Sequence, residues 1–272
     1  IKDFSLGYSR NDWHSLHDFL KKKGFSDNEI EIAGLVKKSE KDNKSFYDRF
    51  RGRIMFPIND SSGRVIAFTG RLFIEDDKSA KYLNSPETPI FNKSSVFFGL
   101  DKAKDSIRKN NFSILVEGQM DLILAHQAGF RNTIATSGTA LSDQTTSKEN
   151  IVSNLGLVRR LSGNIVIAFD GDKAGISAIK RGAKIALSLG MDVKVGDVGK
   201  DLDPADVISK LGVEKWKEII RNSKHVVLFV LNKIIDLADG DNRKLGRAVL
   251  QEVLPYVAFL ESKVEQMHFI KT

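Results

Sequence analysis

Cysteine is absent from this sequence, which excludes disulfides, thiolate zinc sites and cysteine nucleophiles from the chain. Histidine is scarce, and the five that are present form no set with the spacing of metal ligands. No apolar run approaches the ~20 residues that a membrane helix needs, and no signal peptide opens the chain. With 41% hydrophobic and 28% charged residues, the composition is that of a globular protein of one large domain or two to three subdomains.

Acidic residues are the minority charge. The chain has 42 Lys and Arg against 35 Asp and Glu, a formal net charge of +7. Residues 1–110 hold 21 basic and 16 acidic side chains, so +5 of the excess lies there. Such a bias suits a polyanionic partner, because Lys and Arg neutralise phosphates and release counterions. By itself this is weak support, since many basic proteins bind no polyanion.

The first part of the chain, to about residue 110, predicts a mixture of helices and strands. Residues 11–24 have helical spacing that ends at a glycine, and residues 26–36 open with Ser26 as a helix N-cap. Residues 51–58 and 63–73 have the composition of strands, and the NDSSG turn between them predicts a hairpin.

From about residue 111 the pattern becomes strand and helix in alternation. The predicted strands are 112–117, 132–136, 164–170 and 191–198, and the predicted helices are 119–129, 141–156 with Ser142 as a cap, and 176–190, the run after GDKAG. Apolar runs separated by helices indicate a parallel sheet with both faces covered. Beyond about Asp206 the chain is predicted to be helical throughout, with an apolar stripe over residues 215–239.

These patterns predict an α/β protein in three parts. Residues 1–110 form a basic N-terminal α/β subdomain, residues 111–206 a metal-binding subdomain with a parallel sheet, and residues 207–272 a helical subdomain. The loop in the segment IATSGTALS, at another strand end, either lines the site or only caps the next helix through Ser142; both interpretations stay open.

Acidic residues gather at the ends of the apolar runs, against the basic background. The motif ILVEGQMD is followed about fifty residues later by IVIAFDGDKAG. Ligand sites in parallel sheets form beyond the carboxyl ends of strands, so Glu117 and Asp170 should emerge at one edge. Asp121 lies one helical turn after Glu117, and Gly171 permits a tight turn from which Asp170 and Asp172 project together.

Carboxylates gathered in this way repel one another unless a divalent cation lies between them. Hard oxygen ligands suit Mg²⁺ or Mn²⁺ rather than zinc. A single acidic residue at a strand end is usually a solvated turn or a helix cap, and Asp121 alone could complement a helix dipole. The full set favours a metal site. Its candidate ligands are Glu117, Asp121, Asp170, Asp172, Asp203 and Asp206.

The acidic pattern resembles the toprim domain that bacterial primases share with type IA and type II topoisomerases and some nucleases. In that family the Glu and the Asp-x-Asp bind catalytic magnesium. The resemblance therefore implies catalytic roles for Glu117, Asp170 and Asp172.

The segment upstream distinguishes between these reactions. YDRFRGRIMFPIND, GRVIAFTGR and KYLNSPET with IFNK resemble the RNA-polymerase core of bacterial DnaG-type primases, and the resemblance extends to about residue 210. It implies that a set of basic and polar residues contacts nucleoside triphosphate or template; a solvated strand face is the alternative for each alone. The set is Arg51, Arg53, Arg71, Lys81, Asn84 and Lys93. Arginine binds phosphate bidentately and lysine acts as a point charge.

Two departures from the family pattern stand out. The pattern usually closes the site with Asp-Pro-Asp, whereas this chain reads Asp203-Pro204-Ala205-Asp206. The last ligand position therefore falls on Ala205 or is shifted to Asp206, for which a charge at a helix N-terminus is an equal alternative. The family also has an N-terminal zinc ribbon and a C-terminal helicase-binding domain, so the chain resembles a catalytic core without them.

The resemblance implies a bacterial, cytoplasmic DNA-directed RNA primase with Mg²⁺ or Mn²⁺ as cofactor. Its substrates would be ribonucleoside triphosphates, its partners single-stranded DNA template and RNA primer, and its helicase contact would lie in the missing C-terminal domain. A toprim topoisomerase or nuclease is the alternative, but no tyrosine has a convincing setting for strand passage. A non-catalytic toprim module is a second alternative; such modules often lose the acidic set that is intact here.

Overall fold

The computed structural model describes residues 1–40, 45–74, 79–137 and 154–271. The chain divides into two compact units, Ile1–Val96 and Phe97–Thr272. Among the described residues, none of the helices combines the length and apolarity that crossing a bilayer requires.

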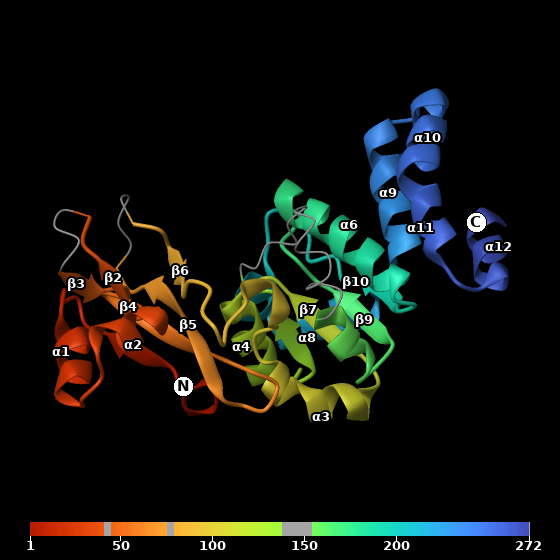
Figure 1. The fold of residues 1–272 in the computed structure, drawn as a ribbon. Helices are drawn as coiled ribbons and strands as arrows, with labels where there is room; N and C mark the ends of the chain where they lie inside the picture. Colours follow the sequence, from red (N-terminus) through yellow and green to blue (C-terminus); the bar gives the residue numbers. More distant parts are fainter. Residues whose placement is uncertain (41–44, 75–78, 138–153, 272) are drawn as a thin grey trace. The chain divides into compact units, whose positions relative to one another are not determined.

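The first unit is built on a four-stranded antiparallel sheet in the order β1-β4-β5-β6 (Figure 1). Its strands are β1 Gly7–Ser9, β4 Arg53–Asn59, β5 Val65–Leu72 and β6 Tyr82–Asn84. The predicted hairpin is β4 with β5: Phe56 pairs with Thr69, and Asp60 closes the turn by accepting from the amides of Ser62 and Arg64. The edge strand β6 pairs with β5 over three residues only.

Two short helices and a second, two-stranded sheet complete the first unit. The helices are α1 Ser15–Lys22 and α2 Asp27–Ile32, and the strands are β2 Val36–Lys38 and β3 Phe46–Asp48; 3-10 turns are Lys2–Phe4 and Lys93–Ser95. Ser26 caps α2 as predicted, in a reciprocal capping box with Glu29. The helix predicted over residues 26–36 is too long, because Val36 pairs with Asp48 as strand β2.

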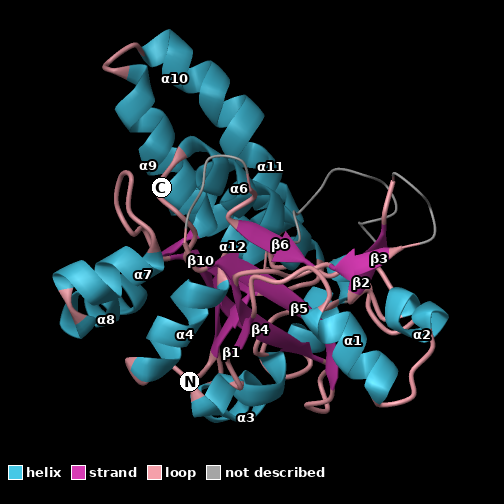
Figure 2. Cartoon of the chain, turned by 90° about the vertical axis from the view of Figure 1, so that its left-hand side faces the viewer, coloured by secondary structure: helices cyan, strands magenta, loops and turns pink. Residues whose placement is uncertain are grey.

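The second unit contains a five-stranded sheet in the order β11-β10-β9-β7-β8, of which Figure 1 labels β7, β9 and β10; Figure 2 draws all strands of the chain in magenta. The strands are β7 Ser113–Val116, β8 Thr133–Ala135, β9 Asn164–Ile167, β10 Asp192–Val195 and β11 Lys224–His225. The first four pair in parallel, as the alternation of strands and helices predicts. An isolated bridge between Phe98 and Ala135 lies at the other edge, on β8.

Both faces of this sheet are buried. Ile165 and Ile167 of β9, and Phe169 just after it, pack into an apolar core cluster together with residues of α3, α6, α9 and α11. The alternate residue Val166 is 6% exposed and lies outside that cluster. Near-continuous apolar strands are typical of a sheet covered on two sides, and they explain why these strands could be found from sequence.

The helices of the second unit connect the strands of its sheet and make up most of the C-terminal tail. Their bounds are α3 Leu100–Asn110, α4 Gln119–Gln127, α6 Lys173–Ser188, α7 Pro204–Asp206, α8 Val213–Arg221, α9 Val226–Ala238, α10 Asn242–Ala248, α11 Leu254–Phe259 and α12 Lys263–Lys271, with π-helical turns at Val207–Leu211 and Val249–Val253. Helices α9, α10 and α11 form a hairpin that extends away from the sheet (Figures 1 and 2).

The tail is not helical throughout, so that prediction is wrong at one point. Lys224 and His225 form β11, which pairs antiparallel with Val195 and Lys194 of β10 and makes the sheet mixed. The predicted helix 141–156 and the loop with Gly138 and Ser142 fall largely outside the described residues. The division at residues 110 and 206 stays a prediction.

Candidate metal and nucleic-acid sites

Glu117 and Asp170 lie side by side at the carboxyl edge of the sheet. Glu117 follows β7 directly, and Asp170 follows the neighbouring strand β9. The amide nitrogen of Asp170 donates to Oε1 of Glu117 at 3.3 Å. Glu117 and the backbone of Asp170 thus meet at one edge of the sheet, and the role of their carboxylates as metal ligands stays a prediction.

Two glycines of the DGDKAG motif allow this close packing. A Cβ atom on Gly171 would lie 1.6 Å from the carbonyl oxygen of Gly199, so the turn between Asp170 and Asp172 packs backbone against backbone on the loop after β10. The amide of Gly171 also donates to the carbonyl of Leu202 at 2.8 Å. A Cβ on Gly175 would lie 2.1 Å from the carbonyl oxygen of Asp170 and 3.0 Å from Oε1 of Glu117.

The carboxylates at this edge disfavour one another's charge. Burial, and then the charge of Asp170, raise the pKa of Glu117 to about 7. Burial, and then Asp203, raise the pKa of Asp121 to about 7. Burial, followed by Asp203, Asp172 and Asp206, raises the pKa of Asp170 to about 6. All six predicted acidic residues thus belong to one electrostatic cluster.

Asp121 is the most buried member, with 6% of its surface exposed. Its Oδ2 accepts from the amide of Gly118 at 2.9 Å, and its Oδ1 accepts from the amide of Ala205 at 3.1 Å. The side chain therefore ties the start of α4 to α7. This geometry gives Asp121 an anchoring role beside the metal role that the sequence suggested.

The remaining acidic residues, Asp172, Asp203 and Asp206, lie at or near the N-termini of helices α6 and α7. Asp172 caps α6 by accepting from the amide of Gly175 at 2.7 Å, and Asp203 caps α7 by accepting from the amide of Asp206. The side chain of Asp206 pairs with Lys210 at 2.8 Å. Ala205 offers no side-chain ligand, and its amide is bound to Asp121, so of the two open alternatives only Asp206 supplies a carboxylate here.

The donor set fits a hard divalent cation. Oδ1 of Asp170 is buried and has no hydrogen-bond partner in the structure, which leaves an anionic oxygen in need of a counter-charge. Across the described ranges, no group of three or more His, Cys, Asp or Glu side chains is arranged so that these side chains alone could hold a metal ion. Mg²⁺ does not require one, because it is usually held by one or two carboxylates together with waters and substrate phosphates.

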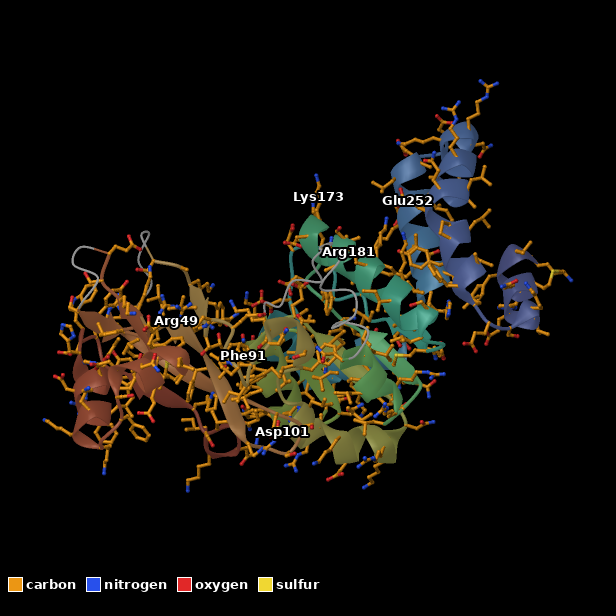
Figure 3. All side chains as sticks on the ribbon, in the orientation of Figure 1. Arg49, Phe91, Asp101, Lys173, Arg181 and Glu252 are labelled. Atoms are coloured by element: carbon orange, nitrogen blue, oxygen red, sulfur yellow. The ribbon has the colours of Figure 1, made fainter. Side chains whose placement is uncertain are left out.

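A basic residue that the sequence analysis missed lies near the acids. Arg181 on α6 donates to the hydroxyl of Ser177 at 2.9 Å, and its charge lowers the pKa of Glu117, opposing the other influences. Figure 3 shows Arg181 and Lys173 projecting from this helix. The signal was in the sequence, since Arg181 follows DGDKAG by two helical turns of α6.

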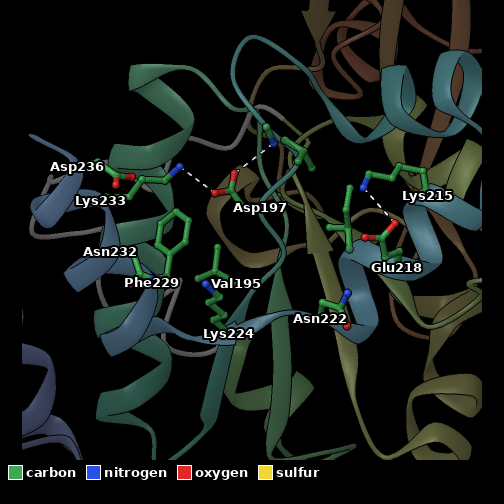
Figure 4. A pocket seen from close by; sticks show the side chains of 13 residues that line it. Val195, Asp197, Lys215, Glu218, Asn222, Lys224, Phe229, Asn232, Lys233 and Asp236 are labelled. Atoms are coloured by element: carbon green, nitrogen blue, oxygen red, sulfur yellow. Dashed lines mark hydrogen bonds and ion pairs between the residues drawn. The ribbon is translucent and has the colours of Figure 1, made fainter. Parts of the chain in front are cut away.

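A pocket of about 500 Å³ lies beyond the end of β10, in the same unit (Figure 4). Its lining carries three lysines and three acids, so the formal charges balance. Lys233 pairs with Asp197 at 2.8 Å, and Lys215 pairs with Glu218 at 3.1 Å. The pocket therefore lacks the excess positive charge that a polyphosphate site needs.

In the first unit, Arg51 lies on an aromatic platform. Its guanidinium carbon is 4.0 Å from the ring centre of Trp13 and 5.2 Å from that of Tyr47. Trp13 is 58% exposed, so the platform is open to solvent. Exposed aromatic rings beside Arg are the features with which proteins bind single-stranded nucleic acid. The sequence analysis found Arg51 but missed Trp13.

Arg53 is buried, with 6% of its surface exposed. Its Nη1 donates to the carbonyl of Gly70 at 2.9 Å and of Lys81 at 3.4 Å, and its Nη2 donates to the carbonyl of Ala80 at 2.9 Å. Arg49, which the sequence analysis did not select, donates through Nε and Nη2 to the carbonyl of Asn84.

The other predicted contacts lie on β5, β6 and the turn beyond. Arg71 on β5 lies with its guanidinium carbon 5.8 Å from the ring centre of Tyr82. Lys81 is exposed and directly precedes β6, and Asn84 ends that strand half-buried. Lys93 opens a 3-10 turn and is half-buried. Contact of any of them with nucleotide or template stays a prediction.

Two family models match the chain: the DNA primase catalytic core, N-terminal domain, over residues 1–104, and the toprim domain over residues 111–196. A DNA primase of Staphylococcus aureus is 40% identical over 270 residues, which is 99% of this chain and 43% of the relative. The chain thus spans less than half the length of that curated relative.

Solved structures extend the similarity to the whole fold. A DNA primase domain from Pseudomonas aeruginosa is 30% identical with a TM-score of 0.82, covering 99% of this chain and 82% of that one. A DnaG primase catalytic domain bound to ssDNA is 26% identical with a TM-score of 0.81, covering 99% and 81%.

Proposed function

The chain belongs to the bacterial DnaG-type primase family, and from this membership we propose that it synthesises short RNA primers on single-stranded DNA. The 3′-hydroxyl oxygen of the primer attacks the α-phosphorus of a ribonucleoside triphosphate, a new P–O bond forms, and pyrophosphate leaves. The hydroxyl proton is released to solvent. The observation that carries the proposal is the cluster of coupled carboxylates around Glu117 and Asp170 in a chain of this family.

The acidic edge is the catalytic centre in this proposal. Glu117, Asp170, Asp172 and Asp203 would hold Mg²⁺ or Mn²⁺, which when bound would lower the pKa of the attacking hydroxyl and neutralise charge on the leaving oxygens. A bound divalent cation would favour the ionised forms of Asp170 and Glu117, whose pKa values are raised to about 6 and about 7 by burial and neighbouring carboxylates. Asp121 orients the loop that carries Asp203, through the amide of Ala205.

The basic unit binds the polyanionic partners. Arg51, Arg71, Lys81 and Lys93 contact template and triphosphate, and Trp13 stacks against a template base. The ssDNA-bound relative supports this assignment of template. Affinity for template should therefore fall steeply as salt rises.

Wider partners follow from the family. The proposal includes a bacterial cytoplasmic location at the replication fork, zinc only in a separate N-terminal domain, and a replicative helicase bound through a separate C-terminal domain. No observation favours the topoisomerase or nuclease alternative. Tyr256, for example, is 1% exposed and donates its hydroxyl proton to the carbonyl of Lys180, so it cannot serve as a strand-cleaving nucleophile.

The test is primer synthesis by this chain on a defined single-stranded oligonucleotide, with labelled ribonucleoside triphosphates and Mg²⁺ or Mn²⁺. Glu117→Gln should lower synthesis by about 10³-fold, since it removes a charge that acts at the reacting centre. The matched control is Glu214→Gln, the same change on an exposed side chain of α8, which should retain full activity.

Template binding is the second measurement in the same test. Glu117→Gln should bind template as tightly as the parent chain. Unchanged synthesis by Glu117→Gln, or no synthesis by the parent chain even at high protein concentration with either metal, contradicts the proposal. Relaxation of a supercoiled plasmid without triphosphates would favour the topoisomerase instead.

A further inference from the structure

Two arginines of one RGR motif take opposite roles in the first unit. Arg51 is half-exposed on Trp13, whereas Arg53 is buried and donates to backbone carbonyls. Resting on the proposed function, we propose that Arg53 is a positioning residue. It fixes the backbone before β6 so that Lys81 meets nucleotide or template phosphate, and it does not touch that phosphate itself.

The backbone of Gly52 separates the two side chains. Gly52 has φ +61°, in the left-handed region, so the chain bends between Arg51 and the start of β4. Arg51 therefore does not follow the alternation of the strand. Its guanidinium lies over the ring of Trp13 and donates to the carbonyl of Asp48, while that of Arg53 is directed across the sheet.

Arg53 crosses the central strand β5 to reach the segment before β6. The path runs over Gly70, where a Cβ would lie 2.9 Å from Cδ of Arg53 and 3.0 Å from the ring of Phe50. Because Gly70 has no side chain, the guanidinium can reach from β4 across β5 to the segment before β6. Its donors end on the carbonyls of Gly70, Ala80 and Lys81.

The segment that Arg53 holds leads into the edge of the sheet, where β5 is its strand neighbour. Strand β6 is the edge strand and pairs with β5 over three residues. The carbonyl of Lys81 accepts from the amide of Leu72 at 2.9 Å and from Arg53 at 3.4 Å. Arg49 holds the far end through the carbonyl of Asn84. The two guanidiniums thus hold both ends of the segment 80–84, which contains Lys81 and Asn84.

The chemistry of the buried guanidinium separates the two roles. The N–H groups of Arg53 that donate to carbonyls inside the unit are not available to a phosphate in solvent. The exposed charge on this segment is that of Lys81, three residues from the carbonyl that Arg49 holds. Arg53 therefore acts through the position of Lys81, and its effect on binding should vanish when Lys81 is already lost.

A double-mutant cycle on the full 272-residue chain tests this. Affinity for a single-stranded oligonucleotide and the KM for ribonucleoside triphosphate are measured for Arg53→Lys, for Lys81→Ala and for both together. Each single change should weaken one of these constants by about tenfold, the value of a charged hydrogen bond. The double variant should be no weaker than Lys81→Ala. Melting curves confirm that every variant is folded.

Gly70→Ala is a second test of the same inference, and it keeps the charges of both Arg53 and Lys81. Its added methyl blocks the path of Arg53, so it should weaken the same constant and also have no effect once Lys81→Ala is present. Arg51→Lys is the contrasting variant. Because Arg51 is proposed to contact template itself, its effect should multiply with that of Lys81→Ala.

Three results would overturn the inference. Multiplying effects of Arg53→Lys and Lys81→Ala, about a hundredfold together, mean that Arg53 contacts the ligand directly. A lowered melting temperature with unchanged affinity and KM means that Arg53 is structural only. If Lys81→Ala alone changes nothing, the assignment of this segment fails along with the inference. The catalytic proposal would still stand on the result for Glu117→Gln.

Discussion

The two units bury charge in opposite ways. In the first unit, the guanidinium of Arg53 donates hydrogen bonds to three backbone carbonyl oxygens. In the second, the negative charges of Glu117 and Asp170 adjoin each other, and Oδ1 of Asp170 is buried with no hydrogen-bond partner. A buried charge is costly unless it is compensated. Backbone carbonyls of the first unit contribute to that compensation for Arg53, whereas the acidic edge needs a cation from solution.

The difference teaches which part of the molecule depends on its ligand. The arginines should hold their geometry before any nucleic acid binds. The carboxylates should be strained until a divalent cation arrives, and their raised pKa values report that strain.

The largest expected effect comes from breaking the turn that carries the acids. Gly171→Ala should destabilise the second unit by about 3 kcal/mol, because the added methyl would lie 1.6 Å from the carbonyl oxygen of Gly199. Gly163→Ala is the matched control, since a Cβ there meets nothing within 4 Å. Urea denaturation of both variants measures the difference. Equal stability of the two would show that the Gly171 turn is not close-packed.

A smaller change in stability is expected from removing one charge in each unit, and its sign should differ between the two units. Arg53→Met should destabilise the protein by about 2 kcal/mol, because buried carbonyls lose their donors. Asp170→Asn should instead stabilise the metal-free protein, because it removes a charge that its neighbours repel.

Arg53→Met and Asp170→Asn should also differ in how their melting temperatures respond to Mg²⁺. Added Mg²⁺ should raise the melting temperature of the parent chain and of Arg53→Met, through binding to the native state. Asp170→Asn should lose that response. If Asp170→Asn destabilises the metal-free chain and still responds to Mg²⁺, the acidic edge is not strained in the way described.

The smallest expected effect is a pH dependence of stability that comes from His225, an ionisable side chain whose neutral form is favoured by burial. Burial lowers the pKa of His225, whose Nδ1 accepts from the amide of Val227 at the start of α9 and whose ring stacks on Phe269 at 4.5 Å. Since the folded-state pKa lies below the unfolded one, the stability that His225 contributes is complete above the unfolded value, near 6.5. It is lost as the pH falls through the folded value.

His225→Asn keeps a helix-capping side chain but does not titrate. Melting temperatures from pH 7.5 to 5.5 should therefore fall slightly more for the parent chain than for the variant. Parallel curves would show that protonation of His225 does not affect the stability of the tail.

The positions of the acidic residues could be predicted because the strands before them are apolar on both faces. Runs such as SILV and NIVI identify buried parallel strands, and the carboxyl ends of such strands share an edge. What lies between the strands could not be predicted. The contact of Gly171 with Gly199 joins residues 28 positions apart through the conformation of a loop, and no local pattern encodes it.

The arginines show the same limit at shorter range. Arg51 and Arg53 have identical side chains two positions apart, and the sequence suggested one role for both. Their different surroundings depend on the left-handed backbone of Gly52 and on the space over Gly70. Strand β11 was missed for a related reason: two residues between helices become a strand only because β10 is there to pair with them.

The two ends of the five-stranded sheet bear on how this protein can be dissected. Strand β10 is covered by Lys224 and His225, and β8 by mutual amide-to-carbonyl bonds with Phe98, at 2.9 and 3.1 Å. Residues 111–196 alone contain every parallel strand but neither cover. A fragment cut at those limits would present two open strand edges and should aggregate. A fragment meant to be studied in isolation should therefore run from Phe97 to beyond His225.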